Sequence, residues 1–341
     1  MRTHERGTSE APGRAAAAEG VFAWNGGLDD ALALELVPVT EAAALAAGRW
    51  AGHSGDSARL AAVDATHTGL RSVPMRGVVV LGAGAREDTP ALFHGAEVGY
   101  GDGPACDVGI SFGDGALSET RDVPCALTAI AVAERGAMLD PPPEFDLEKL
   151  VVAADFADVV DLTRPVAENV RMLAAAKGVR VSDVVVAVLN RPRHVALARE
   201  IQDAGARLHL LEGGEIAGAV ATARAERQVD LLLGTGSAAQ GVIAAAALSC
   251  LGGSMQARLV PRDARRAGEP GTGGVLRTED LVRGENVVFC ATGVTSSELL
   301  GGIRNEGAGR AIAQSVVLCS NPDTVRTVRS EHRYARPSGH E

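Results

Sequence analysis

Arg191 and Arg193 flank a proline at a point where the sequence pattern changes from strand to helix. The preceding run VVVAVL is typical of a buried strand, and Leu197 and Ile201 follow at helical spacing. Two guanidinium groups between a strand and a helix can bind a phosphate in bidentate fashion, assisted by the positive end of the helix dipole. The alternative is a solvated basic turn.

Glycine turns follow three apolar runs, in VVVLGAGA, DLLLGTGSAAQG and VVFCATGVT. Glycine at the carboxyl end of a strand lets backbone amides approach a phosphate at the start of the next helix. The second run fits the G-x-G-x-x-A pattern of dinucleotide-binding folds through Gly234, Gly236 and Ala239. No acidic residue closes the following strand about twenty residues later, so a nicotinamide dinucleotide is disfavoured.

Carboxylates that could bind a cation are concentrated in the first half of the chain. A hard cation such as Mg²⁺ needs several oxygen ligands that converge in space, and most acidic residues are instead surface charges. The group consists of Asp56, Asp64, Glu87, Asp88, Asp102, Asp107 and Asp114.

The positions of the lysines and cysteines in the sequence indicate little reactive chemistry. Neither Lys149 nor Lys177, the only lysines, stands beside a glycine-rich turn as a P-loop or Schiff-base lysine would, so cationic chemistry should come from arginine. The five cysteines are scattered without a C-x-x-C pair, which indicates small buried side chains rather than disulfides or a zinc site.

The elements that must position these residues differ between the two halves of the chain. Thr40 and Glu41 predict the capped start of a helix that runs to Trp50, and the runs at 78–81, 107–112 and 126–133 predict strands. From residue 184 strands alternate with helices, the last helix at 241–251, which predicts parallel strands joined by right-handed crossovers. A final strand, NVVFCATG, follows a surface loop at 261–274.

The prolines at 141–143 interrupt regular structure and predict a subdomain boundary. We expect a disordered leader at 1–20, an N-terminal α+β subdomain at 21–143, a C-terminal α/β subdomain at 144–334 and a frayed tail at 335–341.

Composition limits the kinds of partner. A chain of 341 residues that is 46% apolar can bury one large core or two modest ones, and its formal charge of −10 argues against nucleic-acid binding. The first twenty residues contain no apolar segment typical of a signal peptide, and no run of eighteen apolar residues occurs, so no membrane association is predicted. A cytoplasmic protein with a small-molecule ligand is expected.

Taken in order, the motifs resemble those of the bacterial class II fructose-1,6-bisphosphatases of the GlpX type, over residues 33–334. The matching segments are VTEAAALAAGRW, VVVLGAGAREDTPAL, CDVGISFGDGAL, LEKLVV, NRPRH, EGGEIAGAV, GTGSAAQGV, ARLV and FCATGVT. The resemblance implies an α/β protein with the layered αβαβα fold of inositol monophosphatase-like sugar phosphatases. It also implies a homo-oligomer whose reaction removes the 1-phosphate of fructose 1,6-bisphosphate with Mg²⁺ or Mn²⁺.

The resemblance places the family's five anionic metal ligands on a changed set of residues. Four of the five positions have lost their acid, one has become a cation, and the formal ligand charge falls from −5 to zero. A local gap of two residues would bring Asp56 toward the first position. No metal is expected in this degenerate N-terminal site. The positions are Arg59, Ala83, Ser111, Asp114 and Gln240.

The sugar-phosphate side of the family's site matches better and implies a phosphate clamp in the second half. The family's clamp corresponds to Arg191 and Arg193, and its sugar-contacting DGD run to residues 213–215. The further substrate positions by resemblance are Gly115, Gly214, Ser237 and, in the space of the first metal, Arg59. Asp114, Glu215 and Asp146, the last at a family tyrosine, are candidates for acid–base catalysis.

Three hypotheses about function follow from this mixture. The first is an enzyme that binds a phosphorylated sugar or derivative and acts on it without the family's metals. The second is a non-catalytic sugar-phosphate binder. The third is a residual phosphatase that uses Mg²⁺ or Mn²⁺ held by Asp56, Glu87, Asp88 and Asp107.

Overall fold

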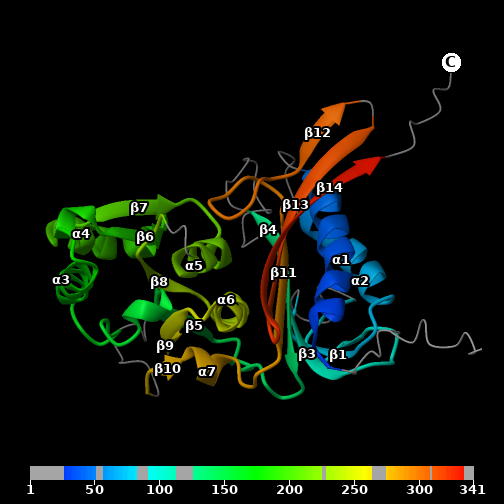
Figure 1. The fold of residues 1–341 in the computed structure, drawn as a ribbon, viewed down its shortest axis with the longest axis horizontal. Coiled ribbons are helices and arrows are strands. Elements are labelled where there is room, and N and C mark those ends of the chain that lie inside the picture. Colours follow the sequence, from blue (N-terminus) through cyan, green and yellow to red (C-terminus); the bar gives the residue numbers. More distant parts are fainter. Residues whose placement is uncertain are drawn as a thin grey trace, which may run out of the picture.

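The computed structural model describes residues 27–50, 57–82, 91–112, 126–224, 228–262, 274–307 and 309–333. Five layers follow one another across the molecule in the order helices, sheet, helices, sheet, helices (Figure 1). The layered αβαβα fold expected from the sequence is confirmed.

An eight-stranded sheet forms the first β layer. The strand order is β12-β13-β11-β4-β3-β1-β2, with β14 paired to β13. The first strands are β1 (Arg76–Leu81), β2 (Glu97–Val98), β3 (Ala105–Phe112) and β4 (Leu127–Glu134). The last are β11 (Val287–Gly293), β12 (Arg304–Gly307), β13 (Arg310–Ser320) and β14 (Asp323–Arg333).

A six-stranded sheet forms the second β layer, in the order β10-β9-β5-β8-β6-β7. Its strands are β5 (Phe145–Val152), β6 (Val185–Leu189), β7 (Arg207–Leu211), β8 (Leu231–Ser237), β9 (Ser254–Pro261) and β10 (Leu276–Arg277). The predicted alternation is confirmed, because β6 lies parallel to both β7 and β8. Strand β5 runs antiparallel to β8 and β9, a pairing that the alternation did not predict.

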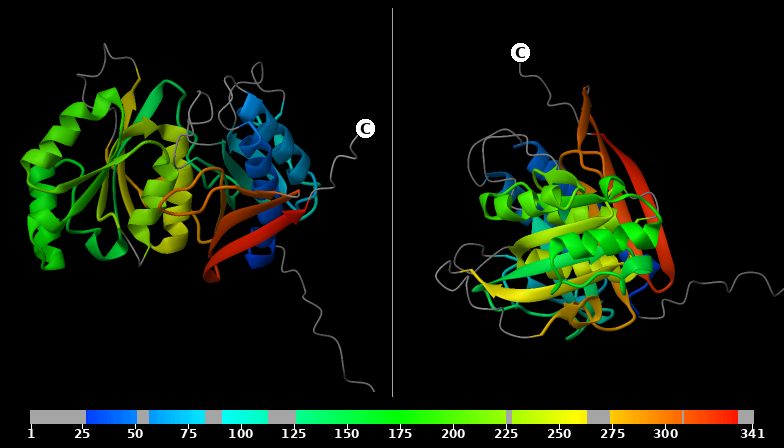
Figure 2. Two further views of the ribbon diagram at one scale, coloured as in Figure 1. Left: turned by 90° about the horizontal axis from the view of Figure 1, so that it is seen from above. Right: turned by 90° about the vertical axis from the view of Figure 1, so that its left-hand side faces the viewer.

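Helices cover both sheets and fill the space between them (Figure 2). Helices α1 (Asp30–Gly48) and α2 (Ser57–Leu70) lie outside the first sheet, and α3 (Val166–Lys177) and α4 (Val195–Asp203) outside the second. Between the sheets lie α5 (Glu215–Ala223) and α6 (Ala238–Leu251), beside the short α7 (Thr278–Leu281). The largest apolar core surrounds α5 and α6 and takes side chains from both sheets. The short 3₁₀ turns are η1 (Ala154–Phe156), η2 (Val181–Asp183) and η3 (Pro192–His194).

Helix α1 begins ten residues before the predicted start. Its cap is Asp29, whose carboxylate accepts hydrogen bonds from the backbone N–H groups of Ala31 and Leu32 at 3.0 and 3.1 Å. Pro38 removes one helix hydrogen bond, but burial of Leu32 and other apolar side chains on both sides of it keeps the helix continuous. The predicted cap, Thr40, is buried within the helix.

Length and composition would also allow α1 to span a membrane, alone among the helices of the described segments. Within its most apolar window 61% of the residues are buried in the fold, against the first sheet, as is typical of a core helix.

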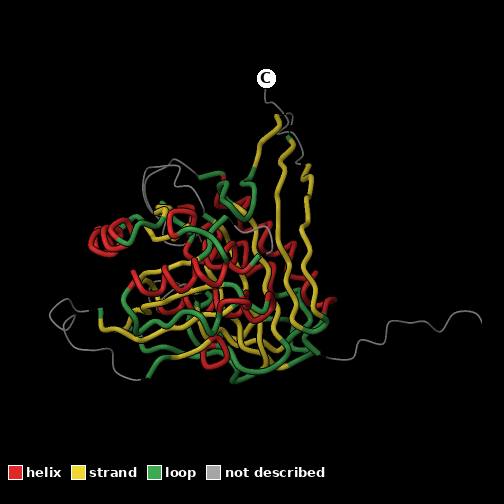
Figure 3. Tube along the Cα trace, turned by 60° about the vertical axis from the view of Figure 1, so that its left-hand side comes forward, coloured by secondary structure: helices red, strands yellow, loops and turns green. Residues whose placement is uncertain are grey.

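The two sheets divide the chain differently from the subdomain boundary expected after residue 143. Strands β11 to β14 return to the first sheet, where Val287 of β11 pairs with Ala133 of β4. Figure 3 shows the long strands of the β13–β14 hairpin extending past the layered body. A proline cluster reports a local interruption, whereas this pairing joins residues more than 150 positions apart, so local composition could not predict it. The expected leader and tail and most of the 261–274 loop lie outside the described residues.

Candidate functional site

The second sheet brings three turns to one edge. Because β6, β7 and β8 are parallel, the segments that follow them meet beyond their carboxyl ends, which is where open α/β sheets bind ligands. The turn after β6 carries Arg191 and Arg193, the turn after β7 carries Gly214 and Glu215, and β8 ends at Ser237. Asp146 joins them because it pairs with Ser237 across the β5–β8 ladder.

The two arginines attach the β6 turn to its neighbours. Arg191 donates from Nη1 to the backbone oxygens of Asn190 and Glu212, at 2.9 and 2.8 Å. Arg193 is exposed and donates from Nε to the backbone oxygen of Thr235 at 2.8 Å. Among the described residues only that nitrogen of Arg193 has a hydrogen-bond partner, so its terminal Nη groups can reach an anion at this edge.

The sequence predicted a turn at the glycine-rich segment 234–237, but these residues belong to strand β8. Strand β8 runs through Gly234 and Gly236 to Ser237, and α6 begins at Ala238 rather than at 241. The Ser237 hydroxyl caps this helix by accepting a hydrogen bond from the Gln240 backbone N–H at 3.4 Å.

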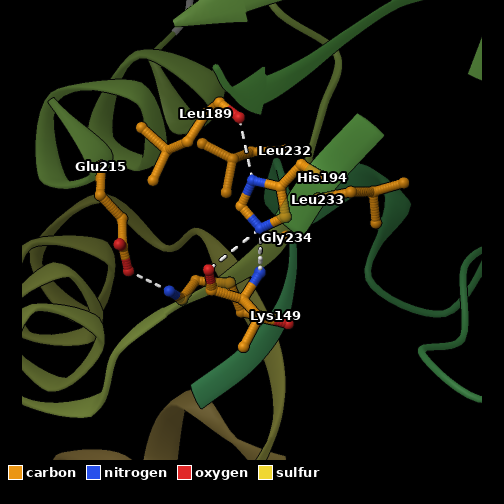
Figure 4. A pocket seen from close by; sticks show the side chains of 8 residues that line it. Lys149, Leu189, His194, Glu215, Leu232, Leu233 and Gly234 are labelled. Atoms are coloured by element: carbon orange, nitrogen blue, oxygen red, sulfur yellow. Dashed lines mark hydrogen bonds and ion pairs between the residues drawn. The ribbon is translucent and has the colours of Figure 1, made fainter. Parts of the chain in front are cut away.

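His194 lies buried against this glycine-rich strand (Figure 4). Its Nδ1 lies 2.9 Å from the Leu189 carbonyl oxygen, and its Nε2 lies 3.0 Å from both the N and the O of Thr235. We assign the neutral Nδ1–H tautomer, because Nδ1–H then donates to Leu189 and Nε2 accepts the Thr235 N–H. Burial lowers the pKa of His194, which favours this neutral form.

A buried ion pair joins Lys149 of β5 to Glu215 at the start of α5. The two side chains are 2% and 5% exposed, and the Lys149 Nζ contacts Glu215 Oε1 (Figure 4). A small cavity of about 10 Å³ is lined by this pair and by His194. Glu215 is therefore committed to Lys149, although sequence reasoning made it a free acid or base.

Lys149 has no glycine-rich turn beside it in the sequence, but the fold places it next to a glycine-rich strand. Lys149 pairs with Gly234 across the β5–β8 ladder. The strand alternation places Leu147, Lys149 and Val151 on one face, toward the helices between the sheets. A single lysine in the apolar run LEKLVV was the sequence signal for a buried cation.

Glycines in β8 make room for the two side chains above them. A Cβ added at Gly234, where φ is +146°, would lie 3.2 Å from the His194 ring. A Cβ added at Gly236 would overlap Glu215 Oε2 and lie 2.9 Å from its Cδ. The G-x-G pattern is thus explained by the packing of His194 and Glu215.

Asp146 adjoins two residues, Phe145 and Arg262, that line a second, larger cavity. Its Oδ1 accepts a hydrogen bond from Arg262 Nε at 2.8 Å, and its side chain is 26% exposed. The cavity has a volume of about 700 Å³ and is lined by the ends of β1 and β9, the prolines at 141–143 and the first turn of α6. Of the three candidate acids, Asp146 is the described one that remains accessible.

The remaining predicted residues are more dispersed. Arg59 lies half-buried on α2, Ser111 is buried in β3, and Gln240 is in the first turn of α6. Asp107, one of the candidate cation ligands, is 3% exposed, and its Oδ2 accepts the Gly136 and Met138 N–H groups at 2.8 and 3.2 Å. The positions that fall outside the described residues are Asp56, Ala83, Glu87, Asp88, Asp114 and Gly115.

The cysteines that the structure describes are buried, as predicted. Burial raises the pKa of Cys106 and Cys290 to about 12 and raises that of Cys250 and Cys319. These thiols are therefore protonated packing groups at neutral pH.

Comparisons with known proteins match nearly the whole chain. A family model described as "Bacterial fructose-1,6-bisphosphatase, glpX-encoded" matches residues 30–332. The chain is 36% identical over 324 residues to the fructose-1,6-bisphosphatase class 2 of Haemophilus influenzae, covering 89% of this chain and 97% of that protein. It is 35% identical over 320 residues to the fructose-1,6-bisphosphatase 1 class 2 of Escherichia coli K12, covering 88% and 95%.

Proposed function

The chain belongs to the bacterial class II fructose-1,6-bisphosphatase family, and we propose that it binds a phosphorylated sugar or sugar derivative and acts on it without divalent metals. The phosphate lies at the turn after β6, against Arg191 and Arg193. The sugar extends along the end of β8 toward Gly214, Ser237 and Asp146.

The observation that carries this proposal is that two arginines of the β6 turn are attached to the neighbouring β7 turn and to strand β8. Arg191 bonds the backbone of the β7 turn and Arg193 that of β8, so both guanidinium groups are held at one sheet edge before any ligand arrives. Preorganised donors lose less conformational entropy on binding. Planar guanidinium groups also match the oxygen geometry of a phosphate.

The described residues at the family's metal positions do not fit a divalent cation. Arg59 offers a cation, Ser111 a hydroxyl that is buried in β3, and Gln240 an amide in the first turn of α6. Mg²⁺ and Mn²⁺ sites are built from carboxylate oxygens and water. These three side chains therefore support metal-independent chemistry.

Among the catalytic candidates, Asp146 suits acid–base work best. Its side chain is partly exposed, and one of its oxygens is held by Arg262, which lines the large cavity. Glu215 instead orients Lys149 inside the protein. Asp114 remains a candidate by its place in the sequence alone.

A metal-dependent phosphatase is the second candidate function. It is favoured by the identity of 35–36% to proteins named fructose-1,6-bisphosphatase class 2, over 95–97% of their length. In that case the ligands expected from the sequence are Asp56, Glu87 and Asp88, which lie outside the described residues, together with the buried Asp107 of β3. A non-catalytic binder would share the phosphate clamp and lack turnover.

A thermal-shift measurement tests the clamp. Fructose 6-phosphate and fructose 1,6-bisphosphate should stabilise the wild-type protein in EDTA, by about 2.7 kcal/mol at 100 times the dissociation constant. Arg193→Ala should abolish the shift. Arg199→Ala, an exposed arginine on the adjoining helix α4, should leave it unchanged. An undiminished shift in Arg193→Ala would place the phosphate elsewhere.

The cellular setting belongs to the same proposal. We expect the protein to work in the cytoplasm as a homo-oligomer on a small phosphorylated metabolite, with no nucleic-acid or membrane partner. Sedimentation of the full chain measures the oligomeric state, and a monomer at all accessible concentrations would contradict that part.

A further inference from the structure

Two consecutive side chains of the β6 turn bind the backbone of a single residue of β8, Thr235. Arg193 Nε donates to the Thr235 carbonyl oxygen at 2.8 Å, and the Thr235 N–H donates to His194 Nε2 at 3.0 Å. One backbone residue is therefore held by the clamp arginine and by the histidine beside it. The place of Arg193 at the clamp depends on how firmly Thr235 is fixed against the β6 turn.

Thr235 lies beyond the end of the β6–β8 ladder. Strand β6 pairs with β8 three and four residues earlier, at Leu232 and Leu231, and then ends. Backbone N–H and C=O groups at a sheet edge need partners once the neighbouring strand has turned away. The side chains of His194 and Arg193 take the place of that strand, because one accepts from the N–H and the other donates to the carbonyl oxygen.

The His194 ring joins the end of β6 to β8 through a hydrogen bond at each nitrogen. Its Nδ1 lies 2.9 Å from the carbonyl oxygen of Leu189, the last residue of β6, and its Nε2 is bound to Thr235. The residue is 4% exposed and packs on Gly234, whose missing Cβ leaves room for the ring (Figure 4). Such a ring has little freedom to move, so it fixes the distance between the two strands.

This bridge requires the neutral ring. With the proton on Nδ1, Nε2 keeps a lone pair for the Thr235 N–H, whereas a protonated ring would compete with Arg193 for the Thr235 carbonyl oxygen. The charged groups that the described structure places around the ring are Arg193 on the same turn, Lys149 of β5 and Glu215 of α5. Burial lowers the pKa of His194, and the two cations act in the same direction.

We propose that neutral His194 is a positioning residue of the phosphate clamp. It holds the Thr235 backbone in place, so that Arg193 Nε stays bound to the carbonyl oxygen and the Nη groups of Arg193 face the anion. This inference rests on the proposed sugar-phosphate site and adds a residue that acts on the ligand through Arg193.

Two substitutions that each keep one half of the bridge test this role. The carboxamide of His194→Gln can take the place of Nε2 and accept the Thr235 N–H. That of His194→Asn is shorter, so it takes the place of Nδ1 and donates to the Leu189 carbonyl oxygen. Each variant loses one buried hydrogen bond, and the melting temperatures of the two should fall by similar amounts.

Calorimetric titration with fructose 6-phosphate in EDTA at pH 7 separates the two variants. His194→Asn should bind at least about tenfold more weakly than His194→Gln, because the glutamine alone keeps Thr235 in place for Arg193. Affinities within about twofold of each other, or tighter binding by the asparagine variant, would mean that His194 serves packing and does not position the clamp.

The nitrogen resonances of the histidine ring give a second measurement, which does not require a folded asparagine variant. In wild-type protein labelled with nitrogen-15 histidine, the ring signals that disappear in His194→Gln identify His194. At pH 7 they should show a protonated Nδ1 and an unprotonated Nε2. A proton on Nε2, or on both nitrogens, would overturn the inference.

The clamp and the positioning role fail in different ways. Arg193→Ala should abolish binding of fructose 6-phosphate if the clamp holds the phosphate. Binding that depends on Arg193 but is equal in the two His194 variants overturns the positioning role alone. Binding that is indifferent to Arg193, or no binding to the wild-type protein, overturns the clamp and the role of His194 together.

Discussion

Lys149 and Glu215 form a buried ion pair at the candidate site, and the sequence did not predict their contact. Both side chains are almost fully removed from water, so each charge is tolerable only because the other is in contact with it. The pair connects β5 of the second sheet to the start of α5, directly beneath the proposed sugar site. Its loss should therefore affect stability more than the loss of any exposed pair nearby.

Substitution Glu215→Gln should lower the free energy of unfolding by about 3–5 kcal/mol, because it leaves the buried Lys149 charge without a counterion. Urea unfolding at pH 7 measures this loss. Adding Lys149→Met to the same protein should recover part of the stability, since the unpaired charge is then gone.

Glu148→Gln is the matched control on the same strand. Glu148 pairs with Arg258 at 2.6 Å, but both side chains are about one-third exposed, so its loss should cost about 0–1 kcal/mol. Equal losses for the two glutamines would show that the buried pair carries no special stabilisation.

The sequence indicated which residues belong to the candidate site better than it indicated which of them contact one another. Arg191, Glu215 and Ser237 were all selected from the sequence, and the structure brings them to one sheet edge. That Glu215 is held by Lys149 could not be predicted, because the two are 66 positions apart and meet only when β5 inserts beside β8. His194 followed the arginine pair in sequence, but its burial against Gly234 is likewise a product of that pairing.

At the scale of elements, the seven residues of β8 have three roles. They extend the sheet, they leave room for His194 and Glu215, and they end at Ser237, which caps α6. The glycines of β8 were interpreted as a turn because glycine after an apolar run usually ends a strand. The strand continues because β5 supplies partners as far as Ser237. Helix α1 shows the converse case, since local signals placed its start at Thr40 although burial of an earlier apolar stretch extends the helix back to Asp30.

Gly236→Ala should destabilise the protein by about 1–3 kcal/mol, as an overpacked core does. The new methyl group would occupy the position of the Glu215 carboxylate, which cannot move freely while it is paired with buried Lys149. Thermal and urea unfolding measure the change.

Gly274→Ala provides the control, because nothing lies within 4 Å of a Cβ built there. It should change the unfolding free energy by less than about 0.5 kcal/mol. A Gly236→Ala protein as stable as this control would mean that Glu215 lies elsewhere in solution.

The whole molecule is a stack of five layers, and its two sheets draw their strands from the sequence in different ways. The parallel part of the second sheet follows from a local alternation of strands and helices, so the sequence predicted it well. The first sheet is completed by strands from the end of the chain, including the β13–β14 hairpin. No local sequence pattern indicates which earlier strand these strands pair with. This difference explains why the sequence predicted the layered class but not the division of the chain between sheets.

The same architecture defines the central claim about function. The clamp belongs entirely to the second sheet, while the family's metal positions that the structure describes lie on α2, β3 and α6. Ligand binding at the clamp should therefore be separable from metal binding. In a relative that depends on metals for its substrate, the two would be coupled.

Calorimetric titration of fructose 6-phosphate into the full-length protein, first in EDTA and then with 5 mM Mg²⁺ or Mn²⁺ at the same ionic strength, tests this claim most directly. We predict binding in EDTA with a dissociation constant that changes by less than about twofold when either metal is added, as expected for negligible coupling between sites. Binding that appears only with metal, or that tightens at least about tenfold, would contradict the account and favour a metal-dependent phosphatase.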